Sequence, residues 1–186
     1  MRRLFFALWL EADPARQLLE SAQALKQGQA RSVPAADLHL TLCFLGQVDD
    51  SALSALCERV AALEPQGFEL EFEALEYWPR AKIVAATAAR TPAAASALAE
   101  SLCAAARAVG LGADDQPFRP HVTLLRRAAL GRRPRSFPLE APLQLPARCF
   151  HLAQSQQLEA TTAAGSQAAR YLRLATWPLR PQAPSA

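Results

Sequence analysis

The sequence contains the same four-residue pattern, His-x-Thr-Leu, at two places. The copies begin at His39 and His121, and they use two of the three histidines in 186 residues. Each copy lies in an apolar run with alternating polar residues, which predicts a β-strand with histidine and threonine on the same face. Two similar halves with one motif each predict a pseudo-symmetric protein in which both motifs face a shared cleft.

Strict alternation along a strand assigns the neighbouring side chains to opposite faces. In the first copy it predicts one face with Leu38, Leu40, Leu42 and Phe44, and another with His39, Thr41 and Cys43. In the second copy it separates Val122 and Leu124 from His121 and Thr123. The same alternation places Arg126 opposite Thr123, so Arg126 reaches the cleft only if the strand ends or bulges near Leu125.

Helical and strand-like segments follow one another without strict alternation, which favours an α+β fold with antiparallel sheets. The predicted strands cover residues 2–10, 38–45, 68–78, 81–88, the second motif, 143–154 and 169–177. The predicted helices cover residues 13–25, 51–63 and 91–110. Loops are expected at residues 27–36 and after the second motif, where Gly131, Pro134 and Pro138 interrupt the chain.

Length and composition fit one compact body. A chain of 186 residues with 51% hydrophobic residues can bury a sizeable core. We expect a single domain over residues 1–178, made of two pseudo-symmetric lobes around the cleft. Each lobe is expected to be an antiparallel sheet with helices on its outer face. Residues 179–186 are expected to form a disordered tail.

The sequence favours a cytoplasmic monomer without membrane association. No apolar run reaches the roughly 18 residues of a membrane span. The apolar start resembles a signal peptide, but Glu11 and Asp13 follow it at once, so we interpret it as a buried first strand. Four cysteines are scattered without metal-type spacing: Cys43, Cys57, Cys103 and Cys149. We expect them to be small buried hydrophobic residues in a reducing compartment.

Arginine is concentrated after the second motif. The formal net charge is only +3, yet six arginines and no acidic residue lie between Arg119 and Arg135. A basic segment so close to His121 favours an anionic ligand, and arginine suits phosphate oxygens. The alternative is a solvated loop in a protein that prefers arginine to lysine, and the sequence leaves both readings open.

Several segments together resemble the two-histidine (2H) phosphoesterase superfamily. They are the two motifs, the opening "FFAL", "LHLTLCFLGQV", "PFRPHVTLLR" and the closing "YLRLATWPL". Within it the chain is similar to the RNA 2′,3′-cyclic phosphodiesterases, once called 2′-5′ RNA ligases. The resemblance covers nearly the whole chain and implies His39 and His121 as catalytic residues. It also implies Thr41, Thr123 and Arg126 as phosphate-binding residues.

The chemistry implied by this resemblance needs no metal and no other cofactor. Two imidazoles can deprotonate water on one side of phosphorus and protonate the leaving oxygen on the other. We expect His39 to be the proton donor to the 3′ oxygen and His121 to be the proton acceptor. Because the two motifs are symmetric, the opposite assignment of the two roles stays open. The expected partner is RNA with a 2′,3′-cyclic phosphate end. The expected product is a 2′-phosphate, and the reverse reaction would be an ATP-independent ligation.

The sequence also offers other candidate site residues and other functions. Trp78 and Phe118 are candidates for stacking on a base, against core packing as the alternative. His151 is expected to be a packed or surface histidine. One alternative is an RNA- or nucleotide-binding module without turnover, and another is a phosphodiesterase for small cyclic nucleotides. A metallohydrolase would need all three histidines, and Asp37 is the only carboxylate within three residues of any of them.

Overall fold

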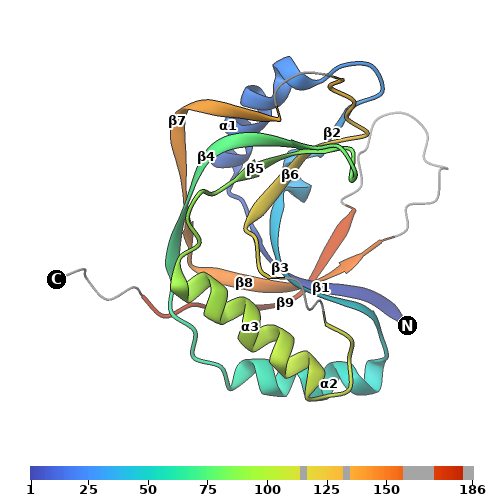
Figure 1. Ribbon diagram of the computed structural model, residues 1–186. Coiled ribbons are helices and arrows are strands. Elements are labelled where there is room, and N and C mark those ends of the chain that lie inside the picture. The colour runs from blue at the N-terminus through green and yellow to red at the C-terminus, as the bar shows by residue number, and fades with distance from the viewer. Residues whose placement is uncertain (114–116, 132–134, 157–169, 182–186) are drawn as a thin grey trace.

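The computed structural model describes residues 1–113, 117–131, 135–156 and 170–181. Its strands are β1 (Arg2–Trp9), β2 (Arg31–Ser32), β3 (His39–Val48), β4 (Phe68–Trp78), β5 (Ile83–Thr87), β6 (His121–Arg126), β7 (Ser136–Ala147), β8 (Cys149–Ser155) and β9 (Tyr171–Pro178). Its α-helices are α1 (Ala12–Ala22), α2 (Asp50–Ala61) and α3 (Ala93–Arg107), and its short 3₁₀ helices are η1 (Gln23–Leu25) and η2 (Ala35–Asp37). The predicted α+β class is confirmed (Figure 1).

The strands form one nine-stranded sheet in the order β7-β4-β5-β6-β3-β1-β8-β9, with β2 paired to β6. All named strand pairs are antiparallel. The two motif strands, β3 and β6, are neighbours at the centre, but only Leu40 and Val122 pair between them. The sheet therefore has two halves with a narrow junction, one of β7, β4, β5 and β6 with β2 added, the other of β3, β1, β8 and β9, and each half contributes one motif strand to that junction. A division into two lobes remains a prediction.

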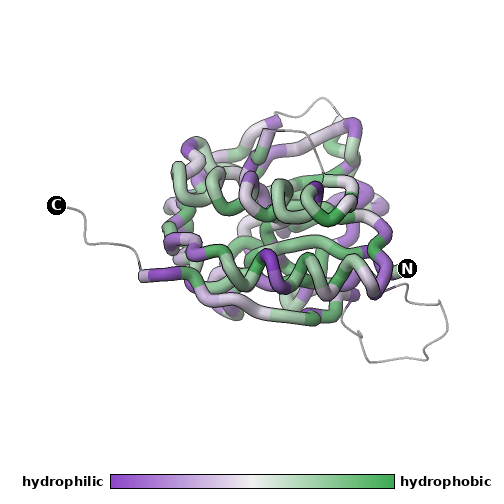
Figure 2. The backbone as a smooth tube through the Cα atoms, turned by 90° about the horizontal axis from the view of Figure 1, so that it is seen from below, coloured by the Kyte–Doolittle hydropathy of each residue, from purple (hydrophilic) through white to green (hydrophobic). Residues whose placement is uncertain are grey.

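The helices cover the two halves from different sides. Helix α1 contacts β6 and β7, whereas α3 contacts β3 and also packs against α2 (Figure 1). Seen from below, α2 and α3 alternate between hydrophilic and hydrophobic segments (Figure 2). Their apolar sides supply Leu56, Leu98 and Leu102 to the core, each at most 1% exposed. No helix in the described part of the chain is long and apolar enough to span a membrane.

The structure corrects two predicted strand boundaries. Strand β3 does not end at Leu45, because Gly46 continues it with a positive φ of 68°. The predicted strand over 143–154 is divided at Arg148 into the end of β7 and the start of β8, which lie in different halves of the sheet.

The segment after the second motif is also more regular than predicted. Strand β7 begins at Ser136 and contains Pro138. Because β7 is an edge strand, a residue without an N–H group is tolerated there. Arg132, Arg133 and Pro134 lie outside the described residues.

Part of the predicted tail belongs to the fold. Leu179 is buried, and its N–H donates to the carbonyl of Arg148. The N–H of Arg180 donates to the carbonyl of Pro65, and its side chain forms an ion pair with Glu64. The fold therefore includes Leu179 and Arg180, which lie past the predicted boundary at 178. Residues 182–186 lie outside the described residues.

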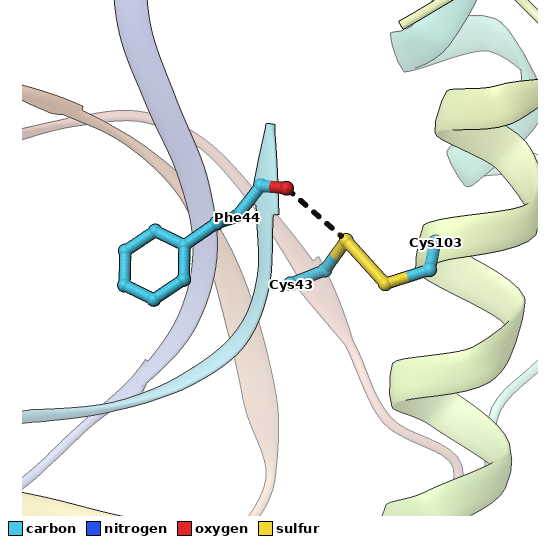
Figure 3. Close-up of a disulfide and its surroundings, with 3 residues drawn as sticks. All are labelled: Cys43, Phe44 and Cys103. Carbon is cyan, nitrogen blue, oxygen red and sulfur yellow. Dashed lines mark hydrogen bonds between the residues drawn. A yellow bond between two sulfur atoms is a disulfide. The ribbon is translucent and has the colours of Figure 1, made fainter. Parts of the chain in front are cut away.

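The expectation of four reduced cysteines is wrong for one pair. Cys43 on β3 and Cys103 on α3 form a disulfide, with their Cα atoms 5.9 Å apart (Figure 3). Cys57 and Cys149 are free and half-buried. The disulfide ties the first motif strand to the helix that packs on it.

Candidate active site

Both motif strands carry a β-bulge at the same position, one residue after the motif threonine. On β3, Thr41 pairs with Ala7 and Cys43 pairs with Phe6, so Leu42 has no partner in the β1 ladder. On β6, Thr123 pairs with Ala85 and Leu125 pairs with Val84, so Leu124 is the extra residue. A bulge reverses which face the following side chains occupy. The first six residues of the two strands accordingly share one burial pattern.

The bulges correct the predicted faces beyond each threonine. Cys43 turns toward α3 and Phe44 to the opposite side, as Figure 3 shows. Strict alternation instead predicts Cys43 on the face of His39 and Phe44 on the face of the leucines. On β6 the bulge brings Arg126 to the face of His121 and Thr123, and Arg126 lines the same cavity as they do. A bulge near Leu125 is what the sequence required for Arg126 to reach the cleft.

The two imidazoles are held in the same way. Nδ1 of His39 lies 2.7 Å from the carbonyl oxygen of Asp37, and Nδ1 of His121 lies 2.9 Å from that of Arg119. A carbonyl only accepts, so Nδ1 carries the proton in both rings. Nε2 of each ring is thus left to exchange a proton with a substrate.

The motif side chains line one cavity of about 420 Å³. It includes both histidines, both threonines and Arg126. Strands β3 and β6 are antiparallel, and Leu40 pairs with Val122. The residues on either side of this pair therefore face each other as His39 with Thr123 and Thr41 with His121. Each imidazole is therefore near the hydroxyl of the other motif, and the arrangement suits a single phosphate group between them.

Burial and nearby positive charge lower the pKa of both imidazoles. The pKa of His39 is lowered to about 4, mainly because burial penalises its charged form. The hydrogen bond to the Asp37 carbonyl raises the pKa in part, whereas the charges of Arg126 and His121 lower it further. The pKa of His121 is also lowered, again mainly by burial; the Arg119 carbonyl opposes this, and the charges of Arg119 and Arg126 add to it. A bound phosphate anion would favour the protonated form of either ring.

Aromatic side chains that the sequence did not single out surround His39. Its ring centroid lies 5.0 Å from Phe5, 5.1 Å from Trp9 and 4.8 Å from Tyr171. The carboxylate of Asp37 accepts the N–H of Arg170, beside Tyr171, at 3.1 Å. This contact joins the start of β9 to the turn before His39. No local pattern in the sequence indicates it, because the two residues are far apart in the chain.

A second cavity of about 520 Å³ adjoins the first and shares Thr41, Phe44 and His121 with it. Both candidates for base stacking, Trp78 and Phe118, line this second cavity. Phe118 is half-buried and packs on the core.

Trp78 is already engaged on several sides. Its ring centroid is 4.7 Å from that of His121, the Arg119 guanidinium lies 4.8 Å above it, and its Nε1 donates to Glu76. Phe44 is different: it is 48% exposed and lines both cavities. Sequence reasoning missed Phe44 because it assumed unbroken alternation.

His151 lies apart from the cleft. It is 7% exposed, and its Nδ1 is 2.8 Å from the hydroxyl of Thr176. Burial, followed by the charge of Arg173, lowers its pKa. Among the described residues, no group of three or more histidine, cysteine, aspartate or glutamate side chains is arranged to hold a metal ion.

Comparison with known proteins gives concordant matches. Residues 8–85 match the family model described as LigT like Phosphoesterase. An Escherichia coli K12 protein named RNA 2′,3′-cyclic phosphodiesterase is 34% identical over 129 residues, covering 69% of this chain and 73% of that protein. A Thermus thermophilus protein of the same name is 33% identical over 165 residues, covering 83% and 82%. The crystal structure of E. coli LigT complexed with 3′-AMP matches with a TM-score of 0.81 at 30% identity, covering 96% of this chain and 97% of that one.

Proposed function

This chain belongs to the LigT-like phosphoesterase family of the two-histidine superfamily and is an enzyme, and we propose that it hydrolyses 2′,3′-cyclic phosphate ends of RNA to 2′-phosphates without a metal. The observation that carries the proposal is the matched pair of imidazoles. Each is fixed through Nδ1 by the carbonyl two residues before it, and both line one cavity with both threonines and Arg126.

In the proposed reaction a water oxygen bonds to phosphorus while its proton passes to Nε2 of His121. The bond between phosphorus and the 3′ oxygen breaks, and that oxygen takes a proton from Nε2 of His39. The sum is addition of one water molecule. The hydroxyls of Thr41 and Thr123 donate to the non-bridging oxygens, and Arg126 stabilises the developing negative charge. With a 5′-hydroxyl as the attacking group in place of water, the same groups would form a bond from that oxygen to phosphorus as the bond to the 3′ oxygen breaks, which is a 2′-5′ ligation of RNA without ATP.

Phe44 is the aromatic side chain best suited to stack on the terminal base. Its exposed ring borders both cavities next to Thr41. Trp78 is held by Glu76, Arg119 and His121, so it would support the site and not receive the base directly. Base stacking on an aromatic ring tolerates any sequence, which suits an enzyme for RNA ends.

The test is to incubate the protein with a 5′-labelled oligoribonucleotide that ends in a 2′,3′-cyclic phosphate, with EDTA present. We expect full activity, because the described residues offer no donor set for a divalent ion. We also expect a 2′-phosphate product, as the resemblance to the RNA 2′,3′-cyclic phosphodiesterases implies. Activity lost in EDTA and restored by zinc or manganese would contradict the proposal. A 3′-phosphate as the main product would mean that the ribose binds in the opposite direction.

The pH dependence of kcat/KM should be a bell with its maximum below pH 6.5. One imidazole must be neutral and the other protonated, and kcat/KM reports the pKa values of the free enzyme. Both are lowered, that of His39 to about 4, so the correctly protonated form is lost as the pH rises toward neutrality. In kcat the alkaline limb should move to higher pH, since the bound anion favours the imidazolium that acts as donor. A kcat/KM maximum above pH 7 would contradict this account.

Replacing Thr41 or Thr123 by valine should lower kcat/KM. The loss should correspond to about 1–3 kcal/mol of transition-state stabilisation, the cost of a lost hydrogen bond to a charged group. Valine keeps the β-branched shape, so steady-state kinetics should isolate the hydroxyl. Thr176→Val is the matched control, because the Thr176 hydroxyl hydrogen bonds with His151 and Thr176 does not line either cavity. An effect of Thr176→Val as large as that of the motif variants would indicate a general loss of stability.

A further inference from the structure

The cavity that holds the two histidines continues beyond His39 to an end lined by arginine. Arg3, Ser155, Arg170 and Tyr171 line this end, and Arg126 lies by the histidines. The adjoining 520 Å³ cavity shares Thr41, Phe44 and His121 with the first but none of the four residues that line this end. The two cavities therefore offer room for a ligand that extends beyond the proposed phosphate position.

Strand register explains why Arg3 and Arg170 come together. Leu4 pairs with Gln154 between β1 and β8, and Ser155 pairs with Tyr171 between β8 and β9. Arg3 precedes Leu4, so the same antiparallel register places Arg3 opposite Ser155. Arg3, Ser155 and Tyr171 are therefore side by side on three neighbouring strands, each about 4.8 Å from the next. Arg3 also shares a face of β1 with Phe5, whose ring contacts His39. Its side chain is thus directed to the same cleft.

Among the described residues, no acidic side chain forms an ion pair with Arg3 or Arg170 at this end, or with Arg126 by the histidines. Of the described residues that line this cavity, Asp37 alone has a carboxylate, and both of its oxygens face the backbone N–H of Arg170. In contrast, Arg119 in the adjoining cavity is paired with Glu76. An anionic ligand group therefore fits the arginine end.

We propose that Arg3 and Arg170 form a second phosphate subsite, which binds the phosphodiester on the 5′ side of the terminal nucleotide. This rests on the proposed function, because it assumes that the cyclic phosphate lies between His39 and His121. It follows that the preferred substrate has at least two nucleotides. It also follows that the preference weakens at high salt, since contacts to phosphate by arginine are screened.

The experiment compares three substrates with the same terminal nucleoside. They are the nucleoside 2′,3′-cyclic phosphate, a dinucleotide with that end, and the same dinucleotide with an uncharged methylphosphonate linkage. We expect kcat/KM to be about tenfold or more higher for the phosphodiester dinucleotide, the size of a charge-assisted contact. The methylphosphonate should fall back to near the mononucleotide. Equal kcat/KM for the two dinucleotides would overturn the subsite.

Two variants and a matched control locate the contact. Arg3→Gln and Arg170→Gln should each lower the ratio of kcat/KM between dinucleotide and mononucleotide. Arg2→Gln removes the same charge one residue away, but Arg2 is paired with Asp50 and does not line the cavity, so its ratio should not change. An equal fall in all three would overturn the assignment to Arg3 and Arg170. If none of the three substrates is hydrolysed by the native protein, the proposed function itself is wrong; if all are hydrolysed equally well, only the subsite is wrong.

Discussion

Replacing His39 or His121 by alanine is expected to lower turnover of a cyclic phosphate by about 10²- to 10⁴-fold, the usual contribution of a general acid or base. The two variants should behave alike, because both imidazoles are held through Nδ1 by a carbonyl and line the same cavity. Steady-state rates on folded, purified variants measure the effect. Both variants should fold, since each side chain is only half-buried in a cleft.

His151→Ala is the comparison that separates a catalytic from a structural histidine. His151 is more buried than either motif histidine, hydrogen bonds with Thr176 and does not line the cavity. Its loss should reduce stability but leave turnover of the folded protein nearly unchanged. If His151→Ala abolished turnover while His39→Ala did not, the repeated motif would be structural.

Loss of the disulfide between Cys43 and Cys103 should lower the free energy of unfolding by about 2–4 kcal/mol. The bond closes a loop between residues 60 positions apart, and closing such a loop restricts the unfolded chain. Denaturant unfolding of the oxidised protein, with and without dithiothreitol, measures this. The same decrease is expected for Cys103→Ser under oxidising conditions, with no further effect of reductant.

Cys57→Ser is the matched control for the disulfide. Cys57 is free, half-buried and on α2, so its replacement should leave the response to dithiothreitol intact. A native protein whose unfolding is indifferent to reductant would show that Cys43 and Cys103 do not stabilise the fold as a pair.

Much of the architecture could be predicted from hydrophobic periodicity. The hairpin of β4 and β5, the three helices and the strand character of both motifs follow from local patterns, and the structure contains them. Pro138 misled the prediction because proline interrupts a central strand but not an edge strand, and edge position depends on the whole sheet. The buried Leu179 was missed for a related reason: its partner, the carbonyl of Arg148, is distant in the sequence.

Prediction of the candidate site from local sequence patterns is limited in the same way, by contacts between strands that the patterns do not contain. The motif residues were identified from their repetition, and alternation holds from each histidine to the residue after its threonine. Beyond that point two bulges reverse it, so that Phe44 and Arg126 enter the cleft and Cys43 leaves it. A bulge is set by pairing with the neighbouring strand, which single-strand periodicity does not contain. Arg170 and Tyr171 were missed because they meet Asp37 and His39 only through the tertiary fold.

The central claim is that the two motif histidines act as one catalytic unit on one phosphate. The most direct test is the rate of 2′-phosphate formation from a cyclic phosphate end by His39→Ala, His121→Ala and the double variant. We predict that the double variant is within about tenfold of the slower single variant, because groups that act together are not additive. If the two losses multiplied instead, the histidines would act independently, and paired acid and base catalysis in this cleft would be contradicted.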